Sequence, residues 1–419
     1  MMGRINKEIW LASGLRTPFV KDNKELKDVS AIDLSSAVVN NMTLKEQVRP
    51  NYLAWGTVVP NLTYSNIARD IVLESELVDE TIAFSTTMAC ASSILSTIQL
   101  ASMISDDETA ISGGVESFSN VQLGLSNETS KWLKKLPKVN GVIDKIKWAG
   151  KIFKFKLYIP PGVNRVTGKS MGQHAEITAQ RLGISRKAQD ELALISHQNY
   201  FKAKDEGFFN DLIFPAFNVV EDLIPRKDTS LEKLSTLKPV FDRKPGKGSI
   251  TAGNSSLFTD GAAGVWVAGK NRINEFNTPY KAKLTDWEMA AVNIEEEGIL
   301  MSPTFAITRL LERNNLNYND IDLWEIHEAF AAQVLSTITN LESPAHLKKS
   351  GIKSKLGKFP MEKLNLKGSS ISIGHPFGAT GARIISQTLK QLHFTGKNKK
   401  ALISVCADGG LGAVILMET

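Results

Sequence analysis

The chain has 419 residues, of which 42% are hydrophobic and 22% are charged, a composition typical of a globular protein of two or three domains. This composition excludes an intrinsically disordered chain and a collagen-like repeat, and no apolar run approaches the roughly 18 residues of a membrane-spanning helix. The formal net charge is +6, yet residues 131–156 hold nine lysines and one acidic residue, so this segment carries +8 and the rest of the chain −2. Because the positive charge is confined to one segment, no diffuse nucleic-acid-binding surface is expected.

The start of the chain and its cysteine content indicate the cellular compartment in which the protein is expected. The opening MMGRINKEIW is too polar for a secretory signal and reaches a strand-like pattern too early for a transit peptide. The two cysteines, Cys90 and Cys406, cannot form a disulfide framework, which favours a reducing compartment. We therefore expect a cytoplasmic protein.

The first part of the chain alternates between strand-like apolar runs and stretches with helical spacing. In chain order the pattern predicts a strand at 9–15, a helix at 28–39, a strand at 52–56, a helix at 66–74, a strand at 81–84, a helix at 94–104 and a strand at 108–112. Such alternation favours an α/β fold with a mostly parallel sheet covered by helices.

A related order returns near the C-terminus. The pattern there predicts a strand at 369–373, a turn at 374–381, a helix at 382–392 and a strand at 401–405. A glycine pair follows the last strand of each part, Gly113-Gly114 in one and Gly409-Gly410 in the other. This order indicates an internal duplication, with a helical, loop-rich insertion between the two parts.

Cys90 lies between a predicted strand and a predicted apolar helix. Unpaired N–H groups and the dipole at a helix N-terminus favour a thiolate, so the position suits a nucleophile. The alternative is a small buried apolar side chain, the common role of a lone cysteine. The hydroxyl residues around it, Thr86, Thr87, Ser92 and Ser93, weigh against that alternative.

Three further residues lie in contexts suited to chemistry. Cys406 ends a strand and enters a glycine-rich turn, where backbone N–H groups can converge on an anion; the alternative is a simple tight turn. His375 lies in GHPFGATG, which suits a general base or hydrogen-bond donor rather than a solvated turn residue. His327 lies at a predicted strand-to-helix junction, where it could also pair with Glu328. The other histidines, His174, His197, His346 and His393, are expected to be structural or exposed.

The sequence lacks the usual signatures of several cofactor classes. It contains no CxxC or HExxH pattern, no GxGxxG after a strand and no Walker-type lysine loop. We therefore expect no metal site and no dinucleotide or nucleoside triphosphate chemistry.

Several strings of the chain, in order, resemble those of the thiolases, the coenzyme A-dependent enzymes that cleave or form 3-ketoacyl thioesters. These strings are RTPF at Arg16, ACAS around Cys90, GGVESFSN from Gly113, SMGQHAE from Ser170, ITAGNSSLFTDGAAG from Ile250, HEAFAAQ from His327, GHPFGATGAR from Gly374 and CADGGLG from Cys406. The resemblance covers nearly the whole chain.

The resemblance implies a thiolase fold, with two similar βαβ-rich halves that form a layered α-β-α-β-α core and an inserted loop domain. Residues 1–120 and 250–280 would form the N-terminal half, 121–249 the inserted loop domain, and 281–419 the C-terminal half.

The resemblance also implies an acyltransferase mechanism, with coenzyme A as co-substrate and no covalently bound cofactor. Cys90 would be the nucleophile that carries the acyl group, His375 its base, and Cys406 the acid and base for the second half-reaction. His375 and His327 would form one oxyanion hole, and the backbone N–H groups of Cys90 and Asp408 the other. Coenzyme A would lie near three residues of the inserted domain and its surroundings, Met171, Ser256 and Phe330.

Two residues depart from the common thiolase pattern. His327 stands where most thiolases have asparagine, and its HEAF string is similar to that of the β-subunits of trifunctional fatty-acid oxidation complexes. Asp408 stands where many thiolases have glycine, which leaves the geometry of the second oxyanion hole open. The histidine favours fatty-acid β-oxidation over a biosynthetic acetoacetyl-CoA thiolase, which remains the alternative. A decarboxylating ketoacyl synthase lacks the second cysteine, and a non-catalytic lipid carrier of the same fold would not need the intact Cys90, His375 and Cys406 set.

The basic segment 131–159 interleaves lysines with aromatic and aliphatic residues, and Pro137 and Gly141 divide it into two short pieces. Ile143, Ile146, Gly150, Phe153 and Leu157 have near-helical spacing. One interpretation is a solvated lysine face on helices that pack on the protein's own core. The other is a surface for an anionic membrane or for a hydratase/dehydrogenase partner subunit, in a chain that forms a homodimer or a dimer of dimers.

Overall fold

The computed structural model describes residues 7–152, 155–159, 162–244 and 246–419. In these residues ten strands form one mixed sheet, in the order β10-β11-β12-β9-β1-β8-β5-β3-β4, with β2 paired to β8. The strands are β1 (Ile9–Ala12), β2 (Val20–Lys21), β3 (Tyr52–Gly56), β4 (Ile82–Thr86), β5 (Thr109–Glu116), β8 (Thr259–Gly269), β9 (Lys281–Ala291), β10 (Leu323–Ile326), β11 (Lys400–Ala407) and β12 (Leu411–Glu418). The β1 strand joins the two halves because it pairs with β8 on one side and with β9 on the other.

The prediction of a mostly parallel sheet is wrong. Among the described strands, β3 runs parallel to β4 and β5, and β10 runs parallel to β11, whereas the other neighbours are antiparallel. The connection from β11 to β12 explains one antiparallel pair, since residues 408–410 alone join the two strands. A parallel pair needs a crossover connection of about a dozen residues or more. Because this link is much shorter, β12 runs antiparallel to β11.

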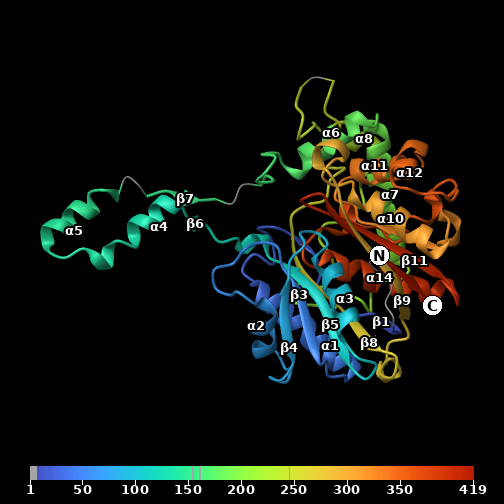
Figure 1. Ribbon diagram of the computed structural model, residues 1–419, viewed down its shortest axis with the longest axis horizontal. Helices are drawn as coiled ribbons and strands as arrows, with labels where there is room; N and C mark the ends of the chain where they lie inside the picture. Colours follow the sequence, from blue (N-terminus) through green and yellow to red (C-terminus); the bar gives the residue numbers. More distant parts are fainter. Residues whose placement is uncertain (1–6, 153–154, 160–161, 245) are drawn as a thin grey trace.

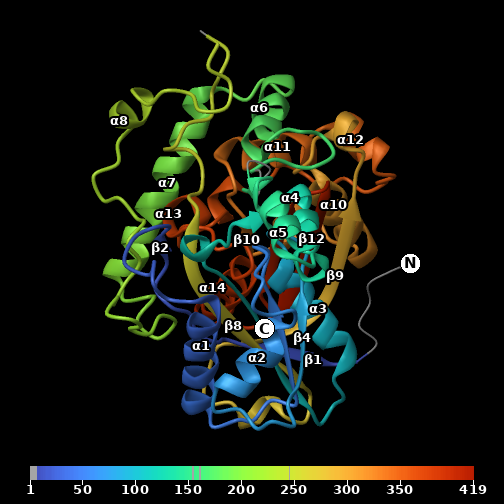
Figure 2. The ribbon, with the colours of Figure 1, turned by 90° about the vertical axis from the view of Figure 1, so that its left-hand side faces the viewer.

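The helices and the two halves of this sheet are arranged in layers (Figures 1 and 2). Two helices, α3 (Ser92–Met103) and α14 (Thr380–Thr395), contact each other and strands of both halves, and so form the central layer. The outer layers are α1 (Ala31–Glu46) and α2 (Ile67–Glu74) on the N-terminal strands, and α10 (Ser302–Asn314) on the C-terminal strands, with α11 (Ala331–Leu341) packed against α10. The expected α-β-α-β-α layering is thus confirmed.

The remaining helices are short or lie in the insertion. They are α4 (Asn127–Leu133), α5 (Val142–Ala149), α6 (Met171–Arg181), α7 (Arg186–Asp205), α8 (Leu231–Ser235), α9 (Ile294–Glu297), α12 (Pro344–Lys349) and α13 (Ser370–Ile373). Among the helices that the structure describes, none is long and apolar enough to cross a membrane.

The strand predicted at 369–373 is wrong, because α13 occupies this position as a single helical turn. Alternating polar and apolar residues predict a strand with one buried face. Here every residue from Ser369 to Ile373 is buried, so the alternation does not separate a core face from a solvent face. The hydroxyls of Ser370 and Ser372 instead bond to the buried side chains of His327 and Ser196.

The basic segment forms an arm, made in the described chain by residues 124–152 and 155–158, that extends away from the rest of the molecule (Figure 1). Its ends pair as β6 (Gly124–Leu125) and β7 (Leu157–Tyr158), and α4 and α5 lie between them. The interpretation that these helices pack on the protein's core is wrong for α5, in which no residue is buried. The predicted helical spacing holds for Ile143 and Ile146, whereas Leu157 is in β7 and Phe153 lies outside the described residues.

Candidate active site

Cys90 lies in a tight turn between β4 and the start of α3. Ala89 adopts a left-handed conformation with φ of 45°, which bends the chain just before the cysteine. Ser92 closes the turn, since its hydroxyl accepts a hydrogen bond from the Met88 N–H at 2.9 Å and donates to the Ala89 carbonyl at 2.7 Å. The turn therefore holds the thiol at the N-terminal end of α3, as predicted.

His375 faces Cys90 from the other half of the chain. Its Nε2 lies 3.1 Å from the Cys90 Sγ, and its Nδ1 lies 2.7 Å from the Thr380 Oγ1. The Thr380 hydroxyl donates its hydrogen to the Pro376 carbonyl at 2.9 Å, so it accepts the hydrogen bond from Nδ1–H. This network assigns the proton of the neutral ring to Nδ1 and leaves Nε2 free to accept the thiol proton.

The protonation of this pair corrects one expectation. Burial, together with the nearby Cys406 and Asp408, raises the pKa of the Cys90 thiol well above its usual range. Burial and the charge of Arg383 lower the pKa of His375 to about 3. The helix dipole, which the sequence indicated would favour a thiolate, is outweighed by the loss of hydration, and the pair rests as thiol and neutral imidazole.

His327 lies beside this pair, at the junction of β10 and α11 where the sequence placed it. Its ring centroid is 4.2 Å from that of His375, and the side chain is fully buried. Burial, then His375 and Arg383, lower the pKa of His327 well below its usual range, so this ring is neutral too. Its Nε2 is buried and has no hydrogen-bond partner among the described residues. A buried polar atom of this kind is available to a bound substrate.

Three side chains of the site each offer one atom that could bind a metal ion, namely Cys90, His327 and His375. These three atoms lie within 4.8 Å of one another. A thiolate and two imidazoles are ligands that zinc accepts, so this triad is the one place among the described residues where His and Cys side chains could hold a soft metal ion. The same atoms form a thiol, its hydrogen-bonded base and a second donor. That arrangement is suited to nucleophilic catalysis.

Cys406 lies at the end of β11 and is buried. Burial raises the pKa of this thiol to about 12, so it holds its proton at neutral pH. The turn that follows begins with Asp408, whose carboxylate accepts hydrogen bonds from the Gly409 N–H at 2.6 Å and from the Asn164 Nδ2 at 2.8 Å. These contacts explain how an aspartate fits at a position where glycine is common. The role of the Asp408 backbone N–H as a donor to an oxyanion remains a prediction.

Glu116 is a site residue whose role the sequence analysis missed. One of its carboxylate oxygens accepts hydrogen bonds from Thr57 and from the backbone of Val58 and Val59, and the other accepts the Gly378 N–H at 3.0 Å. It thereby ties the turn of His375 to the ends of β3 and β5. The available signal in the sequence was its place two residues after the glycine pair, in the string GGVES.

Glycines permit this close approach of the two halves. A Cβ on Gly114 would lie 2.0 Å from the Gly378 carbonyl oxygen, and a Cβ on Gly378 would lie 2.4 Å from the Gly56 carbonyl oxygen. Contacts this short are impossible for other residues, so the glycines let the His375 turn lie directly on the N-terminal strands.

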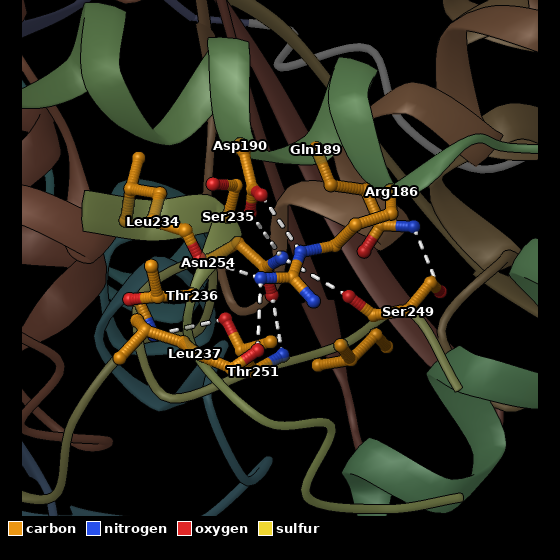
Figure 3. Close-up of polar contacts among 12 residues, drawn as sticks. Arg186, Gln189, Asp190, Leu234, Ser235, Thr236, Leu237, Ser249, Thr251 and Asn254 are labelled. Atoms are coloured by element: carbon orange, nitrogen blue, oxygen red, sulfur yellow. Dashed lines mark hydrogen bonds and ion pairs between the residues drawn. The ribbon is translucent and has the colours of Figure 1, made fainter. Parts of the chain in front are cut away.

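The loop of residues 249–256 is held by a polar network that includes residues of α7 and α8 (Figure 3). Arg186 donates to Asp190 at 2.7 Å and to the carbonyl oxygens of Leu234 and Leu237. The second Asp190 oxygen accepts a hydrogen bond from the Asn254 Nδ2 at 2.9 Å. The network thus fixes the loop relative to α7 and α8.

The same loop leads to the residues predicted to contact coenzyme A. Both the backbone N–H and the hydroxyl of Ser256 donate to the Ala329 carbonyl, at 3.0 and 2.9 Å. Phe330 packs in one apolar cluster with Cys406 and Met171, the first residue of α6. The fold therefore brings Met171, Ser256 and Phe330 to the side of the site that holds Cys406.

The other histidines take part in separate contacts. His174 bonds to Thr167 at 2.7 Å, and the His197 Nδ1 accepts the Arg226 N–H at 3.2 Å. His346 is buried beside Phe305, whereas His393 contacts Tyr280.

Comparisons with known proteins identify the family of the chain. Models of the thiolase N-terminal and C-terminal domains match residues 9–271 and 278–419. A 3-ketoacyl-CoA thiolase of Vibrio cholerae serotype O1 is 36% identical, over 99% of this chain and 98% of its own. Human mitochondrial 3-ketoacyl-CoA thiolase in complex with CoA is similar in structure, with a TM-score of 0.81 at 27% identity over 100% of this chain and 99% of its own. An acetyl-CoA acetyltransferase of Syntrophomonas wolfei has a TM-score of 0.82 at 28% identity, covering 98% and 99% of the two chains. The chain belongs to the thiolase family.

Proposed function

We propose that this protein is a 3-ketoacyl-CoA thiolase, which cleaves a 3-ketoacyl-CoA with coenzyme A to give acetyl-CoA and a shortened acyl-CoA. The observation that carries the proposal is the 3.1 Å contact between the Cys90 thiol and the His375 Nε2. It joins a nucleophile from one half of the fold to a base from the other. The 3-ketoacyl-CoA thiolases that match the chain over its whole length support the choice of substrate.

The first half-reaction transfers the acyl group to the enzyme. His375 Nε2 takes the proton of Cys90 as the sulfur attacks the 3-keto carbonyl, and the bond between C2 and C3 of the substrate then breaks. The acyl group stays on Cys90 as a thioester, and the two-carbon fragment leaves as the carbanion of acetyl-CoA. His327, whose buried Nε2 has no hydrogen-bond partner among the described residues, would stabilise the oxygen that becomes negative.

Cys406 supplies the proton that this carbanion needs. Its thiol is protonated at neutral pH because burial raises its pKa to about 12. After donating that proton, the Cys406 thiolate is a strong base, and it takes the thiol proton of an incoming coenzyme A. The coenzyme A sulfur then attacks the acyl-Cys90 thioester, and the released Cys90 recovers its proton from His375.

Coenzyme A is the only cofactor that this cycle uses, and it is a co-substrate. We propose that it lies along the inserted domain near Met171, Ser256 and Phe330. The proximity of Met171 and Phe330 to Cys406 in one apolar cluster supports this placement, since coenzyme A must bring its thiol to Cys406.

An assay of thiolysis across chain lengths tests the proposal. Loss of 3-ketoacyl-CoA would be followed in the presence of coenzyme A, from acetoacetyl-CoA to long-chain substrates. Activity that rises with chain length supports degradation of fatty acids. Activity on acetoacetyl-CoA alone supports the second candidate, an acetyl-CoA acetyltransferase, which the Syntrophomonas wolfei structure favours. No thiolysis of any substrate would reject both.

We further propose that the protein forms a homodimer or a dimer of dimers in the cytoplasm. The edge strand β4 supports self-association, since its outer edge is unpaired in the described chain and Ile82 is 56% exposed on it. A mechanism with two free thiols supports a reducing compartment. Sedimentation analysis would measure the oligomer, and Ile82→Lys should shift it toward monomer.

We also propose that the arm, residues 124–158, binds an anionic membrane surface. Trp132 and Trp148 stack at 4.4 Å and donate reciprocally to each other's carbonyl oxygens, which ties α4 to α5. This pairing leaves Ile143 and Ile146 exposed beside the lysines of α5. Each lysine near an anionic surface contributes up to about 1 kcal/mol before screening by salt.

Liposome co-sedimentation tests the arm. Binding should require anionic lipid, weaken with salt, and disappear when Lys134, Lys135, Lys145 and Lys147 are all changed to Glu, with thiolysis of short substrates unchanged. A matched control changes four lysines outside the arm, Lys187, Lys227, Lys238 and Lys348, to Glu. Equal loss in both variants, or binding to a hydratase/dehydrogenase subunit but to no liposome, would reject the membrane proposal.

A further inference from the structure

A buried hydroxyl lies between a histidine of the site and a buried arginine. The Ser370 Oγ is 2.8 Å from the His327 Nδ1 and 2.8 Å from the Arg383 Nη2. All three residues are essentially inaccessible to solvent, and they come from three elements: the loop after β10, α13 and α14. Such a chain of contacts restricts where each hydrogen can lie.

The direction of these hydrogen bonds follows from the chemistry of the groups. A guanidinium only donates, so Arg383 donates to the Ser370 oxygen. Ser370 then has one hydrogen left, and the His327 Nδ1 is the remaining partner of its hydroxyl in the described part of the chain. If Nδ1 carried a proton instead, the serine hydrogen would be buried without an acceptor. The Ser370 hydroxyl therefore donates to Nδ1.

The consequence for His327 is a defined tautomer. A neutral imidazole carries one proton, and with Nδ1 acting as acceptor that proton lies on Nε2. Nε2 is the nitrogen that has no partner in the described residues. Arg383 stabilises this arrangement in two ways. It orients the Ser370 hydroxyl, and its positive charge opposes the binding of a second proton to His327.

We infer that Ser370 is a positioning residue, oriented by Arg383, which holds His327 as the Nε2–H tautomer so that the ring donates to the oxyanion of the reaction. The identity of the oxyanion in this inference rests on the proposed function. The tautomer of His327 does not depend on the proposed function. A metal-binding His commonly has its second nitrogen fixed in this way by an outer partner, and the same logic applies to a hydrogen-bond donor.

The tautomer can be measured without any activity assay. With ¹⁵N-labelled histidine, the ring nitrogens of His327, assigned by comparison with His327→Asn, should show an unprotonated Nδ1 and a protonated Nε2 in the intact enzyme. A protonated Nδ1 would overturn the inference, whatever reaction the enzyme catalyses. This measurement uses the wild-type chain, so it does not depend on the folding of any Ser370 variant.

The effect on turnover is tested with Ser370→Ala. This change frees Nδ1 to compete for the proton, and we expect kcat for thiolysis to fall about tenfold, with the KM for coenzyme A unchanged within about twofold. Ser372→Ala is the matched control, because Ser372 is a buried serine of the same turn of helix and bonds to Ser196 instead. An equal loss of kcat in the control would show that packing of α13 is responsible and would overturn the inference.

The decisive comparison uses His327→Asn as background. An asparagine amide donates without any tautomer, so Ser370→Ala should have little further effect on kcat when His327 is already Asn. The same tenfold loss in both backgrounds would assign Ser370 a role independent of His327. If wild-type enzyme thiolysed no 3-ketoacyl-CoA, the proposed function would fail, and the nitrogen measurement would still decide the tautomer.

Discussion

The ring centroids of His327 and His375 lie 4.2 Å apart, and the hydrogen-bond partners of the two rings assign them opposite tautomers. Thr380 accepts the Nδ1–H of His375 and leaves its Nε2 as a base, whereas Ser370 donates to the Nδ1 of His327 and leaves its Nε2–H as a donor. Two neutral histidines side by side are thus suited to the different tasks proposed for them, acceptance of a thiol proton and stabilisation of an oxyanion. The difference comes from two hydroxyl groups and not from the rings themselves.

Cys90→Ala should abolish acyl transfer and leave the fold intact, because it removes the sulfur that forms the thioester. Mass spectrometry after incubation with acyl-CoA should detect an acyl adduct on Cys90 in the wild type and no adduct in the variant. Circular dichroism controls for folding. An adduct on another residue, or substantial turnover by the variant, would contradict the assignment.

Cys406→Ser should still permit acylation of Cys90 but should slow thiolysis and condensation strongly, since a hydroxyl is a much weaker acid than a thiol. A single-turnover experiment separates acylation from the later proton transfers. Turnover within about tenfold of wild type, which is roughly 1.4 kcal/mol of barrier, would mean that Cys406 is only structural.

His327→Asn should be milder than His375→Ala. The asparagine amide still donates a hydrogen bond, and loss of one oxyanion donor typically lowers the rate about 10²–10³-fold. His375→Ala removes the base that contacts Cys90, so both acylation and turnover should fall further. Steady-state kinetics of the two variants would check this order, and equal damage would point to another role for His327.

Glu325→Gln should change how stability depends on pH. Burial raises the pKa of Glu325 from 4.5 to about 7, and one of its carboxylate oxygens has no hydrogen-bond partner among the described residues. Because the folded-state pKa is the higher one, the contribution of Glu325 to stability is complete below about pH 4.5 and is lost as the pH rises through about 7. The loss is on the order of 3 kcal/mol, since each pKa unit corresponds to about 1.4 kcal/mol.

The neutral amide of Glu325→Gln cannot ionise, so the variant should lose less stability between about pH 5 and about pH 8. Denaturant unfolding of both proteins at equal concentration would measure this difference in slope. Parallel curves for the two proteins would show that Glu325 does not titrate in this range.

Much of the site was predictable because local strings carry it. Cys90 lies just before a helix, His375 in the turn between two helices and Cys406 at the end of a strand, all among small residues, and these contexts are visible along the chain. Glu116 was visible as a residue but not as a link to the His375 turn, since its partner Gly378 is 262 residues away.

The sequence by itself determined the strands and helices with clear periodicity, such as β3 and α2, and singled out the residues proposed to carry the chemistry. Tertiary structure alone decided the antiparallel pairing, the helical turn at Ser370–Ile373, and the protonation of the site. These features depend on contacts between distant segments: Cys90 and His375 are 285 residues apart, and His327 and Ser370 are 43. Burial of both thiols and of both rings sets their pKa values, and burial arises only when the two halves close on α3 and α14.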